Sequence, residues 1–284
     1  MNFTDLHSHT AWGIDDGIDT KEHAAQAIAM AKADGICRIL STPHVKPGVT
    51  TKEDIKFFRQ RQKELYVLAA SEGVEIFSGA EVRLNDELIP ALEAGWLPLI
   101  NNGPYMLVEY SVREDYSLQH YTTDLLYEMT VRQIHPVIAH VERYFFKGLD
   151  YDVIDEWRTA GYVFQINATS LLGQDSSFAK KNAWDLIKKG YAHVVSTDTH
   201  RIQGARIENL SKAYSEVEKK FGSKTASLLF KDNPDHILKG EPVEDLPKPE
   251  KRSFFHFGRP QRYCGRFYLF SHQQRRTFEC FSGD

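Results

Sequence analysis

Short β-like runs alternate with helical segments along most of this chain, and this alternation restricts the fold more than any other feature. The first β-like run leads into His7 and His9, and six more follow at residues 36–42, 74–82, 105–110, 135–141, 162–167 and 192–197. Helical spacing or capping residues mark segments 20–33, 51–71, 86–93, 118–132, 152–160, 176–189, 204–221 and 225–229. Seven strands with helical crossovers predict an α/β fold, a parallel βα barrel short of eight strands.

The length of 284 residues allows one large core, and an α/β barrel of this size commonly forms a single domain. We predict that the barrel occupies residues 1–240. Residues 241–284 are expected to be a linker, rich in Pro and Lys at 247–252, followed by a basic, aromatic tail. The tail shows no clear helical or strand period, so we expect it to be flexible. The alternative is a weak anchor to an anionic membrane or to a partner kinase.

Composition and charge restrict the compartment and the partners. Hydrophobic residues make up 42% of the chain and charged residues 26%, as in soluble globular proteins. No apolar run is long enough to span a bilayer and no signal-peptide pattern opens the chain, so we expect a cytoplasmic protein without stable membrane insertion. Residues 248–284 hold eight Lys or Arg and three acidic residues, a net charge of +5, which leaves −9 on the rest. That acidic body argues against nucleic-acid binding.

The cysteines do not indicate thiol chemistry. Cys37, Cys264 and Cys280 are widely spaced and odd in number, which argues against a disulfide framework or a cysteine-rich zinc site. None of them has an arginine six positions later, as the phosphate loop of cysteine-dependent tyrosine phosphatases requires.

Potential metal ligands recur near the ends of successive β-like runs. His7 and His9 should point to the same side of an extended backbone, because side chains alternate along a strand. Since the carboxyl ends of parallel barrel strands share one face, ligands distant in sequence would converge there. The candidates are His7, His9, Asp16, His44, Glu81, Glu109, His140, Asp198 and His200. Each alone has a plain structural explanation, such as a surface histidine or a helix cap, but their regular placement favours a metal centre.

This set exceeds what one ion needs, so we predict a cluster of two or three. Imidazole suits manganese, iron and zinc, and carboxylates favour manganese or iron. Shared carboxylates allow ions about 3.5 to 4 Å apart, as in hydrolytic two-metal sites. Arg143 lies three residues beyond His140 and could bind a phosphate through two parallel hydrogen bonds. The alternative for Arg143 is a surface salt bridge.

Several segments resemble the polymerase and histidinol phosphatase (PHP) superfamily, and more closely its bacterial CpsB/YwqE-type tyrosine-protein phosphatases. The resemblance covers roughly residues 1–240 and is carried by segments 5–17, 42–44, 79–81, 135–144, 165–173 and 196–200. It implies a distorted seven-stranded barrel with three metal ions, commonly Mn²⁺, with iron, zinc or magnesium as alternatives.

The resemblance also implies how the ligands are divided. Carried over by position, His7, His9, Glu81 and Asp198 would hold one ion, Glu81, Glu109 and His140 a second, and Asp16, His44 and His200 a third. Arg143 matches the phosphate-binding arginine of the family. A further family arginine usually lies five residues after the last histidine, but here position 205 is alanine and Arg206 follows it. Arg206 is therefore a weaker match than Arg143, and Arg201 is a substitute.

The function implied by the resemblance is removal of phosphate from tyrosines of a membrane-associated bacterial tyrosine autokinase that controls capsule or exopolysaccharide assembly. Direct hydrolysis is expected, because metal binding lowers the pKa of water from about 15.7 towards neutrality. The alternatives are a small-molecule phosphomonoesterase such as histidinol phosphatase, a PHP-type exonuclease, and a metal-bound regulatory module without turnover. The acidic body counts against the exonuclease and the complete ligand set against the regulatory module. The sequence leaves the oligomeric state open, a homo-oligomer included.

Overall fold

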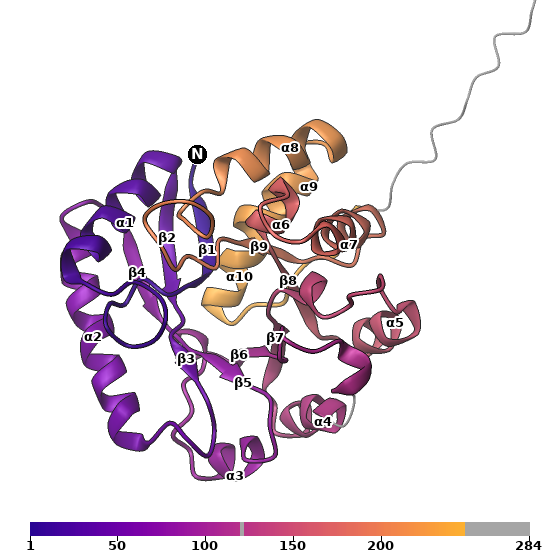
Figure 1. The fold of residues 1–284 in the computed structure, drawn as a ribbon, viewed down its shortest axis with the longest axis horizontal. Coiled ribbons are helices and arrows are strands. Elements are labelled where there is room, and N and C mark those ends of the chain that lie inside the picture. Colours follow the sequence, from indigo (N-terminus) through magenta and orange to yellow (C-terminus); the bar gives the residue numbers. More distant parts are fainter. Residues whose placement is uncertain (120–121, 248–284) are drawn as a thin grey trace, which may run out of the picture. The chain divides into compact units, whose positions relative to one another are not determined.

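The structure is a computed structural model that describes residues 1–119 and 122–247. The tail predicted at residues 248–284 lies outside the described residues. In the described part, β-strands lie at the centre and helices surround them (Figure 1). Within residues 1–119 and 122–247, every helix is too short or too polar to cross a bilayer.

The strands form two parallel sheets, which confirms the predicted parallel α/β class. One sheet has the order β1-β2-β4 and the other the order β3-β5-β6-β7-β8-β9. The strands are β1 (Phe3–Ser8), β2 (Ile36–Ser41), β3 (His44–Val45), β4 (Glu75–Ser78), β5 (Glu81–Arg83), β6 (Tyr105–Glu109), β7 (His135–Ile138), β8 (Val163–Asn167) and β9 (Val194–Ser196). A parallel bridge between Ser8 and Thr199 joins the end of β1 to the chain that follows β9.

Within the described residues there are nine short strands where the sequence predicted seven, because one predicted strand is divided and a two-residue strand follows another. The run predicted at 74–82 is divided into β4 and β5, and β3 follows β2 after Pro43. Proline has no N–H group to donate to a neighbouring strand, which accounts for the break there. Hydrogen bonds nevertheless continue across both breaks, from Gly79 N to Ser41 O (3.0 Å) and from Glu81 N to Pro43 O (3.1 Å).

The helices largely follow local capping signals. They are α1 (Lys21–Asp34), α2 (Lys52–Ala70), α3 (Leu88–Glu93), α4 (Thr123–Val131), α5 (Tyr151–Thr159), α6 (Ala168–Leu172), α7 (Ser177–Lys188), α8 (Ser211–Phe221), α9 (Ser223–Ser227) and α10 (Asn233–Lys239). Thr20 caps α1 by accepting a hydrogen bond from His23 N, and Thr51 and Asp54 form a reciprocal capping box on α2. The predicted helices at 20–33 and 51–71 are therefore confirmed.

The C-terminal helices depart from the prediction. The helix predicted from residue 204 begins at Ser211, because the carboxylate of Asp34 accepts hydrogen bonds from Leu210 N (2.6 Å) and Ser211 N (2.8 Å) and so caps α8 from another helix. Helix α10 was not predicted; it continues from a π-helical turn at Leu228–Asp232, and Pro234 lies in its first turn. Residues beyond 240 also pack on this unit, since Leu246 is buried.

Alternate strand residues face two apolar layers. Met106 and Val108 pack in the layer that includes the surrounding helices, whereas Leu107 belongs to an inner cluster. That inner cluster also contains Leu6, Leu40, Val137, Val163 and Val194. Along each strand these apolar residues precede the polar candidates, so the carboxyl ends are left for a polar site.

Candidate metal centre

The predicted metal ligands converge at the carboxyl ends of the strands. His7 lies in β1 and His9 follows that strand, while His44 in β3 pairs in register with Glu81 in β5. Glu109 is the last residue of β6. The remaining members follow their strands: His140 after β7, and Asp198 and His200 after β9. Parallel pairing thus brings together residues far apart in the sequence.

The carboxylate of Glu81 lies at the centre of the cluster and is fully buried. Its Oε2 atom is 3.2 Å from His7 Nε2, 3.3 Å from His9 Nε2 and 3.0 Å from His44 Nδ1. Its Oε1 atom is 2.8 Å from His140 Nε2. One carboxylate therefore faces four imidazole rings and could be shared between ions.

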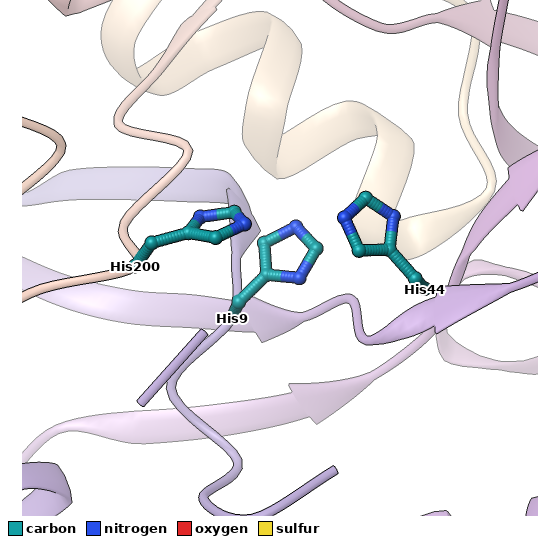
Figure 2. Close-up of side chains that lie close together, drawn as sticks. All are labelled: His9, His44 and His200. Carbon is teal, nitrogen blue, oxygen red and sulfur yellow. The ribbon is translucent and has the colours of Figure 1, made fainter. Parts of the chain in front are cut away.

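Several subsets of these side chains are close enough to hold an ion. In each of four groups, the three ligand atoms lie within 4.8 Å of one another. The groups are His9, His44 and His200; His7, His9 and Asp198; His7, Glu81 and His140; and His44, Glu81 and Glu109. Figure 2 shows His9 between His200 and His44, with ring centroids 4.0 and 4.5 Å from its own.

The two aspartates differ in their surroundings. Asp16 is exposed, and its Oδ1 atom lies 3.4 Å from His44 Nε2 and 3.5 Å from His200 Nε2. Asp198 is buried, and its Oδ1 atom lies 3.5 Å from His7 Nε2. Asp198 has a φ of 54°, and His140 has a φ of 31°. Left-handed backbone at non-glycine residues is costly and tends to occur at functional sites.

The histidine pKa values respond to burial and to the carboxylates. Burial alone would lower the pKa of His7, but attraction to Glu81 and Asp198 raises it to about 9. Burial is likewise outweighed at His44, where hydrogen bonds to Glu109 and Glu81 raise the pKa to about 11. The carboxylates thus favour positive charge on their partners, whether that charge is a proton or a metal ion.

His200 behaves in the opposite way. Burial, together with the nearby positive charge of His9 and Arg206, lowers its pKa to about 2 despite the attraction of Asp198. Its Nδ1 atom lies 3.0 Å from the backbone oxygen of Asp198, which can only accept. A neutral His200 therefore carries its hydrogen on Nδ1 and offers the Nε2 lone pair.

Two arginines border the cluster. Nη1 of Arg143 lies 3.6 Å from Asp198 Oδ2, and its Nε atom is 3.1 Å from Asp175 Oδ2. Nη2 of Arg206 lies 2.7 Å from Asp198 Oδ1 and 2.9 Å from His200 Nε2. Both guanidinium groups therefore reach the carboxylate of Asp198 from outside the imidazole cluster.

Arg201 has a different position. Its Nη1 atom donates to the backbone oxygens of Asp16 (2.5 Å) and His200 (2.8 Å). It ties the loop after β9 to the opening loop. Beside it, a cavity of about 600 Å³ is lined by residues 15–19, His23 and residues 200–203. This cavity gives access from solvent to Asp16 and His200.

Sequence reasoning missed several side chains that hold the cluster in place. Asp15 accepts from His9 Nδ1 (2.8 Å) and from His44 N (2.9 Å) through the same Oδ2 atom. Nη2 of Arg83 lies 3.0 Å from Glu109 Oε1. For Arg83 a signal was present, since it follows Glu81 by two positions and so lies on the same side of β5.

Two polar residues of β8 were also missed as site residues. Gln165 and Asn167 are buried and bond to members of the cluster. Their signal was polarity at alternate positions of an otherwise apolar strand.

Comparisons with known proteins agree with this arrangement. The family described as "Capsular polysaccharide synthesis, CpsB/CapC" matches residues 3–239. The tyrosine-protein phosphatase CpsB of Streptococcus pneumoniae is 31% identical over 241 residues, covering 82% of this chain and 97% of that protein. The tyrosine-protein phosphatase YwqE of Bacillus subtilis is 26% identical over 251 residues, covering 87% and 96% respectively.

A similar fold occurs in solved structures. One comes from the work on YwqE from Bacillus subtilis and CpsB from Streptococcus pneumoniae, described as unique metal-dependent tyrosine phosphatases. It matches with a TM-score of 0.75 and 26% identity, covering 89% of this chain and 100% of that chain. A β-aspartyl dipeptidase from Fervidobacterium islandicum shares the fold at a TM-score of 0.52 and 13% identity, covering 85% of this chain and 76% of its own. On the family match and the pneumococcal relative, this chain belongs to the CpsB/CapC family.

Proposed function

We propose that this chain is a metal-dependent protein-tyrosine phosphatase that acts in capsule or exopolysaccharide synthesis. The observation that carries the proposal is the cluster of imidazole and carboxylate groups around Glu81, bordered by Arg143 and Arg206. The names of the relatives support phosphotyrosine as the substrate group, and the family description supports the capsule pathway. We further propose a membrane-associated tyrosine autokinase as the substrate protein. The cytoplasmic location stays a prediction.

The donor set fits divalent metal ions. Nitrogen and oxygen donors are mixed, and all but those of Asp16 and His44 are buried. This combination suits manganese, iron or zinc, and the carboxylates favour Mn²⁺. We propose that the ligands are His7, His9, Asp16, His44, Glu81, Glu109, His140, Asp198 and His200. The grouping of His9 with His44 and His200 supports a third position in which Asp16 is an additional donor.

Bound ions would lower the pKa of a coordinated water and offset charge on a phosphoryl group. Arg143 and Arg206 would bind the phosphoryl oxygens. Asp175 holds Arg143 at Nε and Nη1 lies 3.6 Å from Asp198 Oδ2, so the guanidinium is held beside the cluster, where its planar group suits a two-point contact. Arg206 contacts Asp198 and His200 directly, whereas Arg201 is engaged with backbone oxygens, so we favour Arg206 over Arg201 as the second arginine. A phenol has a pKa of about 10, so tyrosine leaves with less need for a proton than an alkoxide, and no general acid is assigned.

We propose that the two sheets together form one distorted barrel with seven strand positions. The Ser8–Thr199 bridge supports contact between β1 and the end of β9. The hydrogen bonds that cross the breaks after β2 and β4 support treating β2 with β3, and β4 with β5, as two strand positions. The barrel domain would occupy residues 1–240, followed by residues 241–247, which pack on it, and then by the linker and tail.

The proposal is tested by measuring the release of phosphate from a tyrosine phosphopeptide and from histidinol phosphate, and the release of nucleotides from single-stranded DNA. Chelated protein should be inactive, and Mn²⁺ should restore hydrolysis of the phosphopeptide in preference to the other two substrates. A strong preference for histidinol phosphate would favour the small-molecule alternative, and release of nucleotides would favour the exonuclease.

A double variant links this activity to the cluster. His7→Ala with His9→Ala should remove at least one ion and nearly all turnover, because both rings face Glu81 Oε2. His135→Ala is a suitable control, since this exposed histidine lies at the opposite end of its strand. A well-folded double variant with full activity would defeat the assignment.

A further inference from the structure

Two buried amides lie beside the cluster without belonging to the proposed ligands. Gln165 and Asn167 are 0% and 1% exposed, and as i, i+2 residues of β8 they face the same side. A buried amide is costly unless its hydrogen bonds are made. Here those bonds join the amides to each other and to members of the cluster.

The partners of these amides fix the direction of each hydrogen bond. The backbone N–H of His140 can only donate, so Gln165 Oε1, at 2.9 Å, is its acceptor. Nε2 of Gln165 then donates to Asn167 Oδ1 at 2.8 Å. Nδ2 of Asn167 donates to Asp198 Oδ2 at 2.9 Å, because an ionised carboxylate only accepts. Exchanging the oxygen and nitrogen positions of either amide would therefore place two acceptors or two donors against each other.

The same chain determines the tautomer of His7. Oε1 of Gln165 lies 3.1 Å from His7 Nδ1 and cannot donate, so Nδ1 must carry a hydrogen. In the neutral ring, Nε2 then offers a lone pair. That atom lies 3.2 Å from Glu81 Oε2 and 3.5 Å from Asp198 Oδ1, inside the cluster.

We propose that Gln165 and Asn167 form an amide relay that positions His7, His140 and Asp198 for divalent ions. This inference rests on the proposed metal-binding function and deepens it. The relay holds the ring of His7 with Nε2 directed inward and fixes the backbone of His140, where φ is 31°. It also engages Oδ2 of Asp198, so that Oδ1 faces the imidazoles. Both amides are positioning residues that contact neither the ions nor the substrate.

The test compares Gln165→Leu with Gln165→Glu, and uses Gln62→Leu as a matched control. Gln62 is also a buried glutamine, but its Nε2 donates to the backbone oxygens of Ser41 and Gly79, which are not proposed ligands. Calorimetric titration of the chelated proteins with Mn²⁺ should show binding about 10- to 100-fold weaker in Gln165→Leu, the usual effect of losing a residue that orients a ligand. Gln62→Leu should bind Mn²⁺ as the unmodified protein does.

Proton NMR of the zinc-loaded proteins provides a readout that reduced stability alone does not move. The unmodified protein should show a His7 Nδ1–H signal protected from exchange with water, and Gln165→Leu should lose it. Gln165→Glu keeps the acceptor oxygen that faces His7 Nδ1 and His140 N, so it should keep the signal, but it has no donor for Asn167 Oδ1, so its Mn²⁺ binding should be weakened. A retained signal or unchanged Mn²⁺ affinity in folded Gln165→Leu overturns the relay, as does unchanged Mn²⁺ affinity in folded Gln165→Glu. Failure of the unmodified protein to bind either metal would overturn the proposed function itself.

Discussion

Oδ2 of Asp15 lies 2.8 Å from Nδ1 of His9 and also accepts the backbone N–H of His44 at 2.9 Å. Its other oxygen accepts from Gly17 N at 2.9 Å. One carboxylate thus connects the opening loop, the ring of one proposed ligand and the strand that carries another. When His9 donates from Nδ1, its Nε2 atom is left to face the cluster, as expected for a histidine that ligates a metal.

Asp15→Asn should weaken Mn²⁺ binding about 10- to 100-fold without unfolding the protein. Asparagine keeps the size of the side chain but has a single acceptor oxygen. Either Gly17 N must therefore lose its acceptor, or His9 Nδ1 and His44 N must lose theirs. Calorimetric titration of chelated protein measures the effect. Asp19→Asn, a control in the same loop that alters an exposed pair with His23, should bind normally. Equal affinities for the two variants would contradict the role of Asp15.

The pH dependence of the metal-free protein provides a second prediction. In that state the pKa values of His7 and His44 are about 9 and 11, above the ordinary value of 6.5. Protonation of these rings therefore stabilises the fold fully below pH 6.5. The contribution of His7 is lost as the pH rises through 9, and that of His44 declines over the same range and is lost only as the pH rises through 11. We expect the melting temperature of chelated protein to fall between pH 6.5 and pH 9, as measured by scanning calorimetry.

Metal binding should release the protons that these two rings hold in the metal-free protein. Because a metal requires neutral imidazole, ions must displace the protons from His7 and His44, and Mn²⁺ affinity should rise over this pH range. Titrations in two buffers with different heats of ionisation count the protons released. A melting temperature that rises towards pH 9, or binding without proton release, would show that these rings are neutral in the metal-free protein.

The positions of the strands and of most candidate ligands could be predicted from the sequence. The local sequence pattern shows where each strand ends. Parallel pairing then places residues such as Glu81 and His140 at the same edge of the sheet, whatever the exact register between the strands. Which of two adjacent acids faces inward could not be predicted. Asp15 and Asp16 are neighbours, yet Asp15 is largely buried against His9 while Asp16 is exposed, because the loop closes on residues from β3 and from after β9.

Contacts between distant segments account for the other differences. The start of α8 depends on Asp34, which belongs to α1 and carries no local signal for a cap at Ser211. The breaks in the strands could be anticipated at Pro43 but not at Gly79. A Cβ atom at Gly79 would lie 3.1 Å from the side chain of Leu40, so a larger residue there would press on the packing of the neighbouring strand.

Two truncations should separate the packed unit from the tail. Ending the chain after Pro247 should leave phosphopeptide hydrolysis within a few-fold of the full chain, because every proposed ligand and arginine precedes residue 207.

Ending it after Gly240 removes Glu244, whose backbone bonds to the side chain of buried Asn233 at 2.9 and 2.7 Å. An unsatisfied buried amide costs about 1–3 kcal/mol, so urea unfolding should show a clear loss of stability. Equal stability of the two truncations, or loss of metal from the longer one, would contradict this division.

Substitutions of Arg143 test whether this residue binds phosphate or only forms a structural ion pair. It lies between Asp175 and Asp198, and both carboxylates raise the pKa of its guanidinium against the effect of burial, so the group stays charged. Arg143→Ala should lower turnover of a tyrosine phosphopeptide by on the order of 10²- to 10³-fold, the usual cost of losing one preorganised donor to a transition state. Arg143→Lys keeps the charge but loses the planar two-point contact, and should recover only part of the activity.

The control for Arg143 is Arg132→Ala, which breaks ion pairs with Glu93 and Glu128 at the surface. Kinetics, metal content and thermal unfolding should be measured for all of the variants, because the assignment requires that turnover falls while bound metal and stability stay close to those of the unmodified protein. Asp175→Asn adds a graded case, since it weakens the hold on Arg143 Nε without removing the guanidinium, and its turnover should lie between those of the unmodified protein and Arg143→Ala. If Arg143→Ala loses activity only in proportion to lost metal or lost stability, Arg143 supports the centre through its ion pairs and does not bind phosphate.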